Sequence, residues 1–360
     1  MADLIKINGH GHLLPYPEEI PRFMQEKEIF WIDPERQFMR QKDWQRPITD
    51  ASFFLDEKLA WMAKHSIEHE VVLTLSQLYC NGVERKLAND VLRFQNDYNA
   101  MIQAKHPGKF TTGFVIHPAC IDSSLKEIER CVEELDLHLM CLPTHWMDDD
   151  GQWHSVADEQ LEPIFKLANE YKLAMEIHPY DGPRMIGLKD RNWRFHLVWM
   201  CAQTADTYHL FTLLDYDEIY PNIRTCFAHG NQFAQMNVGR RVQGFEGRPD
   251  LFEGARHPLA ALGAHNLFFD TLVHDKYSLE LLIRRQGVSQ ILAGLDDPYP
   301  LGEMETVPGS YPGRVLDEAM AEGIITEEDR ADIWCQNVLN WLGEPTSTRI
   351  KKHLKLETHE

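Results

Sequence analysis

The sequence predicts an α/β fold, namely a (β/α)8 barrel with a small insertion after its first strand and helices at the carboxyl end of the chain. Eight short, mostly apolar segments recur along the sequence, and helical patterns separate them, as expected for parallel strands with helical crossovers. A length of 360 residues suits one such barrel, and a hydrophobic content of 43% is ample for a large core. We therefore expect a single domain over residues 1–343 and a polar, frayed tail over residues 344–360.

The predicted strands are runs of apolar and β-branched residues, and they cover residues 5–12, 71–75, 110–116, 137–142, 173–177, 223–227, 266–269 and 291–294. The first clear helical pattern, over residues 52–65, places Leu55, Leu59 and Met62 on one side. Later helical patterns cover residues 89–105, 123–135, 160–171 and 193–214, and helices continue to about residue 342. Residues 13–50 are rich in proline and lack a clean period, which predicts an irregular insertion with a small hairpin that acts as a lid.

Composition excludes several classes of protein. The net charge of −20 disfavours non-specific binding to nucleic acid or to an anionic membrane surface. No apolar run approaches the length that spans a bilayer, and the amino terminus lacks the apolar region of a signal peptide. Seven scattered cysteines without a C-x-x-C pair are typical of reduced, mostly buried thiols and not of a disulfide framework. These features predict a soluble, cytoplasmic protein.

A His-x-His pair ends the first predicted strand. Side chains two residues apart in an extended chain point to the same side, so His10 and His12 can aim two imidazoles at one point, with room left by Gly9 and Gly11. Neutral imidazole is a good ligand for zinc and for similar divalent metals. In a chain with 18 histidines the pair alone is weak evidence, so its weight depends on the other strand ends.

Three other predicted strands also end in side chains that can bind metal. His178 ends the fifth strand region, His229 the sixth and Asp296 the eighth. The carboxyl ends of barrel strands meet at one face, where catalytic groups gather. His10, His12, His178 and Asp296 would together form a site of three imidazoles and one carboxylate that leaves room for water.

Motifs at these strand ends and in the insertion resemble those of a known family. They are His10-Gly11-His12, Glu176-Ile177-His178-Pro179, Phe227-Ala228-His229-Gly230, Val238-Gly239-Arg240, the run from Gly294 to Glu303, and an Arg46-Pro47 pair. The strand-end motifs are similar to those of the metal-dependent amidohydrolase superfamily over nearly the whole chain. The two arginines and the Pro-Leu-Gly-Glu ending of the last motif narrow the resemblance to the 2-amino-3-carboxymuconate 6-semialdehyde decarboxylase family.

The resemblance implies a metal-dependent carboxy-lyase in which His10, His12, His178 and Asp296 hold one zinc ion. His229 would act as the acid and base beside the metal-bound water, whose pKa zinc lowers to about 7. In the family mechanism, hydroxide adds to the diene of the semialdehyde and loss of carbon dioxide expels it, without an organic cofactor. The implied setting is tryptophan–kynurenine or related aromatic catabolism.

The same resemblance implies how the substrate is bound. Arg46 and Arg240 would clamp its two carboxylates, since a planar guanidinium suits a carboxylate better than an ammonium does. Arg240 would reach into the neighbouring subunit, so the resemblance implies a homodimer. Trp193 falls near an active-site tryptophan of the family, whereas His196 stands where a second aromatic residue is expected, which departs from the family pattern.

Other functions stay open at this point. The same ligands suit decarboxylation of a hydroxybenzoate, or hydrolysis of a lactone or a meta-cleavage product. Hydrolysis of a neutral ester gives the two arginines no obvious role, and a non-catalytic metal-binding scaffold would not need His229. The fourth predicted strand lacks the lysine that binuclear relatives carboxylate, and Asp297 would point away from the ligands, so a single metal ion is favoured. Iron, cobalt or manganese can occupy such ligands in place of zinc.

Overall fold

The computed structural model describes residues 4–35, 37–42, 44–180 and 191–356, and it confirms the predicted barrel. Its parallel strands are β1 (Ile7–His12), β5 (His69–Leu73), β6 (Phe110–Thr112), β7 (Phe114–Val115), β8 (Leu139–Pro143), β11 (Ala174–His178), β12 (Arg224–Phe227), β13 (Leu267–Asp270) and β14 (Ile291–Leu292). They pair in the orders β1-β5-β6 and β7-β8-β11-β12-β13-β14, and only Gly113 separates β6 from β7 along the chain. The ring closes where the Gly9 N–H donates to the Ala293 oxygen (2.7 Å) and Gly11 forms a bridge with Asp297.

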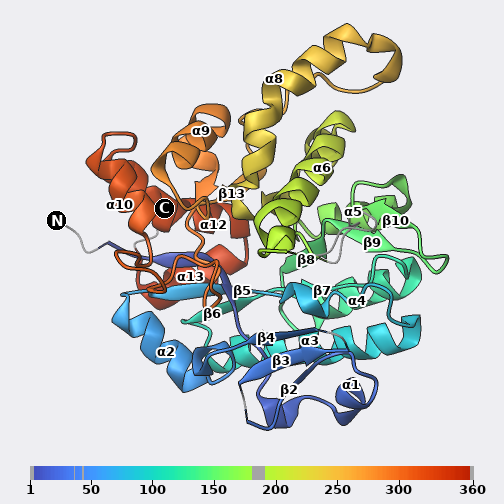
Figure 1. Ribbon diagram of the computed structural model, residues 1–360, viewed down its shortest axis with the longest axis vertical. Coiled ribbons are helices and arrows are strands. Elements are labelled where there is room, and N and C mark those ends of the chain that lie inside the picture. Colours follow the sequence, from blue (N-terminus) through green and yellow to red (C-terminus); the bar gives the residue numbers. More distant parts are fainter. Residues whose placement is uncertain (1–3, 36, 43, 181–190, 357–360) are drawn as a thin grey trace.

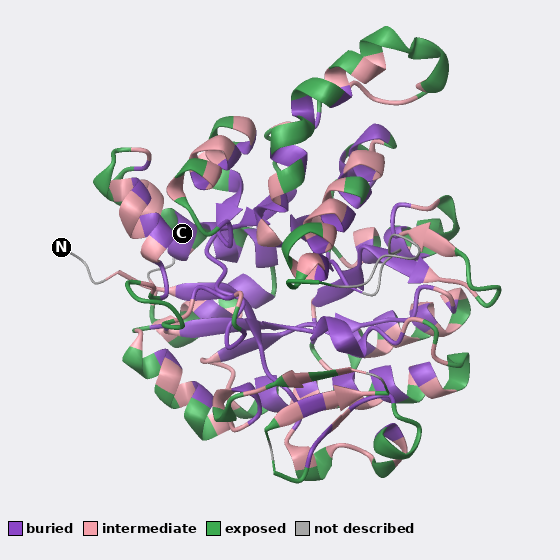
Figure 2. Cartoon of the chain, in the orientation of Figure 1, coloured by how far each residue is buried: buried purple, intermediate pink, exposed green. Residues whose placement is uncertain are grey.

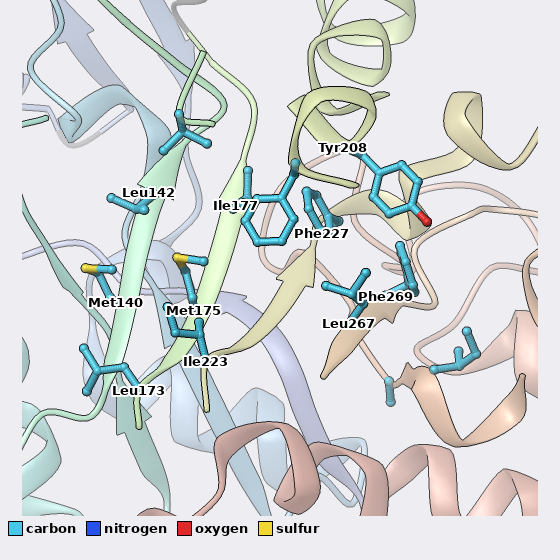
Figure 3. Close-up of a cluster of buried hydrophobic side chains, with 14 of the residues drawn as sticks. Met140, Leu142, Leu173, Met175, Ile177, Tyr208, Ile223, Phe227, Leu267 and Phe269 are labelled. Atoms are coloured by element: carbon cyan, nitrogen blue, oxygen red, sulfur yellow. The ribbon is translucent and has the colours of Figure 1, made fainter. Parts of the chain in front are cut away.

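Each predicted strand has a counterpart in this ring, and side chains alternate along the strands between an outer apolar layer and the interior of the barrel. In β11, Met175 and Ile177 belong to the apolar cluster that packs against the helices, whereas Glu176 and His178 face into the barrel. Figure 3 shows Met175 and Ile177 in one apolar layer with Phe227 of β12. The interior holds apolar side chains such as Leu139, Cys141 and Phe268 beside the polar Glu176 and His178.

Helices cover the outside of the barrel (Figure 1). Their bounds are α2 (Leu55–Lys64), α3 (Arg85–Lys105), α4 (Ile121–Glu133), α5 (Glu162–Glu170), α6 (Met200–Leu213), α7 (Tyr216–Ile219), α8 (Gln232–Gly247), α9 (Lys276–Gln286), α10 (Arg314–Ala321), α11 (Glu327–Trp334) and α12 (Gln336–Leu342). A short hairpin of β9 (His145–Met147) and β10 (Trp153–Ser155) follows β8. The outer part of α8 extends beyond the rest of the molecule, and much of its surface there is exposed (Figure 2). None of the helices in the described ranges is both long and apolar enough to cross a membrane.

The insertion is more regular than the sequence predicts. It contains α1 (Arg22–Glu26) and a three-stranded antiparallel sheet of β2 (Trp31–Ile32), β3 (Phe38–Gln41) and β4 (Trp44–Pro47). These strands have only two to four residues each, so the sequence offers no alternation long enough to reveal them. Met39 is fully buried in the apolar cluster that also contains barrel residues, so the insertion is packed onto the barrel.

The prediction of a frayed tail is wrong for residues 346–354. They form α13 (Thr346–Leu354), and Ile350 is fully buried. Ile350 and Leu354 lie one turn apart on an otherwise polar helix and pack against the apolar cluster. A stripe of two residues is too short to stand out in the sequence, which is why the helix was missed.

Candidate metal centre

The carboxyl ends of three strands bring the four predicted metal ligands together. His10 and His12 lie on β1, and their Nε2 atoms are 3.3 Å apart. Asp296 follows β14, and its Oδ1 lies 3.1 Å from His12 Nε2 and 3.8 Å from His10 Nε2. The ring centroid of His178, the last residue of β11, lies 5.4 Å from that of His10 and 5.9 Å from that of His12. All four side chains are buried.

Contacts with backbone carbonyls show which nitrogen of the His12 and His178 rings carries the proton. His12 Nδ1 lies 3.2 Å from the Leu73 oxygen, and His178 Nδ1 lies 2.9 Å from the Pro179 oxygen. A carbonyl oxygen can only accept, so both rings carry their proton on Nδ1 and present a lone pair at Nε2. Among the described residues, none forms a hydrogen bond with the buried His178 Nε2. The lone pair of His178 therefore faces the centre without a donor, and that of His12 faces His10 and Asp296.

The electrostatics of this centre favour a cation. Burial, together with the neighbouring histidines, lowers the pKa of His178 well below its usual value, so the ring is neutral. Although burial opposes ionisation, the close approach of His12 and the charge of His10 hold the pKa of Asp296 well below its usual range, so the carboxylate is charged. Neutral imidazole nitrogens and a carboxylate oxygen that converge in this way are the donor set of divalent transition metals. The residues present therefore fit such an ion.

Asp270, which the sequence reasoning missed, organises this centre. It is the last residue of β13, is fully buried, and its Oδ2 lies 2.8 Å from His10 Nδ1. Although burial opposes it, this carboxylate raises the pKa of His10 to about 9. Carboxylates that bind the second nitrogen of a ligating histidine fix the orientation of its ring. Its place at a strand end, after Phe268 and Phe269, was the signal in the sequence that could have identified it.

His229 lies against the predicted ligands in a strained turn. Its ring centroid is 4.8 Å from that of His178 and 5.6 Å from that of His10, and nitrogen atoms of these three rings lie within 4.8 Å of one another. Its φ of +58° is rare for a residue with a side chain, and Asp270 supports it by accepting the backbone N–H groups of His229 and Gly230 (2.9 Å each). Burial lowers the pKa of His229 to about 4, so the imidazole is neutral near pH 7 and able to accept a proton.

A cavity of about 160 Å³ opens onto this centre. His12, His178, His229 and Asp296 line it, so three of the four predicted ligands and His229 face the same space. Arg46 of β4 also lines the cavity, and its guanidinium lies 4.6 Å from the ring centroid of Tyr299. The cation–π contact holds the guanidinium at the cavity wall.

The other two predicted substrate-binding residues are not on this wall. Arg240 lies on α8 and lines a separate hollow of about 720 Å³ between α6 and α8. Trp193 is 37% exposed, and its ring contacts that of His196 (5.1 Å between centroids), which itself lines the cavity. Of the three predicted binding residues, the structure therefore brings only Arg46 to the centre within this chain.

Comparison with known proteins agrees with this geometry. The family model described as "Amidohydrolase" matches residues 7–339. The chain belongs to the amidohydrolase family. A 2-amino-3-carboxymuconate-6-semialdehyde decarboxylase from Dictyostelium discoideum is 27% identical to this amidohydrolase over 352 residues, which cover 94% of the chain and 92% of the relative. The predicted family resemblance is thereby confirmed, and so is the prediction of a metal-dependent carboxy-lyase.

Solved structures share the fold of this amidohydrolase. The 5-carboxyvanillate decarboxylase of Sphingomonas paucimobilis matches with a TM-score of 0.72 at 16% identity, over 94% of this chain and 99% of the other. A dihydroxybenzoic acid decarboxylase of a Polaromonas species matches with a TM-score of 0.70 at 16% identity, over 94% and 97% of the two chains, and its structure contains bound manganese. At this level of identity the likeness concerns the fold alone.

Proposed function

We propose that this amidohydrolase is a zinc-dependent, non-oxidative decarboxylase of 2-amino-3-carboxymuconate 6-semialdehyde in tryptophan–kynurenine or related aromatic catabolism. The observation that carries the proposal is a buried centre of three histidines and one aspartate that opens into a cavity lined by Arg46. The name of the Dictyostelium relative supports the choice of substrate. In this proposal His10, His12, His178 and Asp296 hold the zinc ion.

The chain's own residues would bind the substrate and move a proton. Bound zinc supplies Lewis acidity and a water of lowered pKa next to the substrate. Arg46 binds one carboxylate of the substrate, and a guanidinium can do so with two parallel hydrogen bonds. His229, neutral near pH 7, accepts a proton at a ring nitrogen and returns it to the carbon from which carbon dioxide departs. The Asp270 carboxylate holds His229 in place by accepting a hydrogen bond from the His229 backbone N–H.

We also propose that the enzyme is a homodimer in which Arg240 binds the second carboxylate in the partner's site. Arg240 is exposed in the middle of α8 and does not line the cavity of its own chain. Phe233 and Met236 of the same helix are 39% and 79% exposed, and burying such apolar area is favourable. A second copy of the chain packed against α8 would bury Phe233 and Met236, and Arg240 would enter the cavity of that copy.

The substrate proposal is tested with freshly generated semialdehyde and zinc-loaded protein in the cytosolic pH range. We expect loss of the near-ultraviolet chromophore together with release of carbon dioxide. His229→Ala should lower turnover by about 100-fold or more at unchanged zinc content, because general acid–base catalysis contributes about 10²–10⁴-fold. His145→Ala is the matched control, since the His145 imidazole pairs with Asp206 (3.0 Å) and does not line the cavity.

The same assay separates the alternatives. Decarboxylation of a hydroxybenzoate without loss of the semialdehyde would mean that the proposed substrate is wrong and that the enzyme is nevertheless a decarboxylase. Hydrolysis of lactones or meta-cleavage products without release of carbon dioxide would contradict the proposed decarboxylase.

Mixing two inactive variants tests the shared arginine. If Arg240 acts in the partner's site, mixing Arg240→Ala with His229→Ala restores one intact site in each mixed dimer, or about a quarter of wild-type activity at random exchange of subunits. If Arg240 acts within its own chain, mixing restores nothing, and if Arg240 plays no part in the reaction, Arg240→Ala is active by itself.

A further inference from the structure

A buried lysine lies beside the metal centre and contacts the backbone of one predicted ligand. Lys58 of α2 is 0% exposed. Its ammonium contacts the Asp297 carboxylate, Oε1 of Glu70 (2.7 Å) and the backbone oxygen of His12 (3.2 Å). Glu70 belongs to β5, and Asp297 directly follows Asp296. Burying an ammonium is costly unless close partners surround it, so these contacts determine where the surrounding backbone can lie.

Asn8 connects the same cluster to both strand ends that supply ligands. Its Nδ2 donates to Asp297 Oδ1 (2.7 Å), and its Oδ1 accepts the backbone N–H groups of His10 and Leu295 (3.1 Å each). The Asp296 N–H donates in turn to the His10 oxygen (2.7 Å). The cluster therefore spans the seam where the first and last strands of the barrel meet.

Packing and charge leave little freedom at this seam. A Cβ on Gly11 would lie 2.5 Å from Glu70 Oε1 and 2.9 Å from Asp297 Oδ1, so only glycine fits there. Burial, and then the Asp297 charge, raises the pKa of Glu70 to about 8. As the sequence predicts, Asp297 points away from the metal ligands, and the structure shows that Lys58 and Asn8 hold it there.

We propose that Lys58 is a positioning residue for the metal. By holding both Asp297 and the His12 carbonyl, it fixes the spacing between the strand ends that carry His12 and Asp296. Asp296 has a φ of +50°, which side-chain-bearing residues rarely adopt, so its backbone depends on such support. The inference rests on the proposed metal centre but not on the identity of the substrate.

The test measures cobalt binding to Lys58→Met, which keeps the length of the side chain and removes its charge. We expect the affinity for Co²⁺ to fall about 10–100-fold, as is typical when residues that support metal ligands are lost. The visible ligand-field spectrum of the cobalt-loaded protein should also change, because it reports the geometry around the ion. Arg224→Met is the matched control, since Arg224 is a partly buried cation at the opposite, amino end of β12. It should lower stability and leave cobalt affinity and spectrum unchanged.

Asp297→Asn provides a second, nearly isosteric variant in case Lys58→Met does not fold. It replaces the carboxylate that Lys58 contacts with an amide, and it should change the spectrum and lower cobalt affinity about 10-fold. Wild-type affinity and spectrum in either folded variant would overturn the role of Lys58, and so would failure of the wild type to bind cobalt. Wild-type protein that binds cobalt but does not convert the semialdehyde would contradict the proposed substrate alone.

Discussion

The two ends of the barrel differ in how far the hydrogen-bonding groups of their polar side chains are satisfied. At the amino end, Arg224 begins β12 and donates hydrogen bonds to the backbone oxygens of Lys172, Asn222, Trp341 and Leu342 at 2.7–3.2 Å. At the carboxyl end, imidazole nitrogens and a carboxylate oxygen face one another at 3.1–3.8 Å, and the buried His178 Nε2 has no hydrogen-bond partner among the described residues.

This difference separates stability from function within one fold. A buried polar group that the chain itself satisfies contributes to the free energy of unfolding, whereas an unsatisfied one costs free energy until a ligand binds. Variants at the carboxyl end should therefore change metal binding and turnover, and variants at the amino end should change stability.

The largest effect is expected for His178→Ala at the carboxyl end. Loss of one ligand should lower decarboxylase activity by about 10³-fold or more, since Lewis-acid assistance contributes several kcal/mol and each 1.36 kcal/mol is a factor of ten. Zinc at 100 times its Kd should raise the free energy of unfolding of the wild type by about 2.7 kcal/mol, and much less in the variant. Urea unfolding with and without zinc measures this. Equal stabilisation of both proteins would show that His178 is not a ligand.

Arg224→Met should have the next largest effect, and on stability alone. Hydrogen bonds to charged groups contribute about 1.5–3 kcal/mol, so losing four of them, with partial replacement by water, should lower the free energy of unfolding by about 3 kcal/mol. Urea unfolding of the metal-free protein measures the loss, and kcat/KM of the folded variant should stay unchanged. A large loss of activity at normal stability would contradict the separation between the two ends.

The sequence allowed the barrel and the convergence of His10, His12, His178 and Asp296 to be predicted, for a physical reason. Short runs of apolar and β-branched residues indicate strands, and parallel strands in a barrel end at one face, so polar residues directly after such runs must approach each other. Asp270 ends a strand in the same way and could have been included.

Other features were out of reach because they depend on contacts between distant segments. Lys58 continues the stripe of Leu55, Leu59 and Met62 on α2, but only the folded chain shows Glu70 and Asp297 around it. Arg240 lines a hollow outside the cavity of its own chain, which the strand-end pattern did not indicate.

Asp270→Asn tests the comparison between the two ends of the barrel, because the Asp270 carboxylate lies at the carboxyl end and yet has hydrogen-bond partners on both oxygens. Its carboxylate accepts from the backbone N–H groups of His229, Gly230 and Leu272 and contacts His10. An amide has one acceptor oxygen and two donors of its own, so it cannot satisfy these groups. Metal affinity should fall about 10–100-fold, measured by competition with a chelator. Unchanged affinity would mean that the His10 ring needs no support from this carboxylate.

The smallest effect concerns His69, a fully buried histidine at the amino end. It begins β5 and is satisfied by the Gly108 oxygen (3.3 Å) and Thr111 Oγ1 (2.9 Å). Burial lowers its pKa from 6.5 to about 3. Between these values the unfolded chain binds a proton that the folded protein does not, so stability falls as the pH falls through this window.

From pH 7 to pH 5 this residue should remove about 2 kcal/mol from the free energy of unfolding. His69→Gln keeps a donor and an acceptor without titrating, so the variant should lose about 2 kcal/mol less than the wild type over the same range. Urea unfolding of both metal-free proteins at the two pH values provides the measurement, and the difference between them cancels the other acid-sensitive groups. Equal losses of unfolding free energy in the two proteins would show that His69 is protonated in the folded state, so that the amino end, too, contains a buried group that titrates.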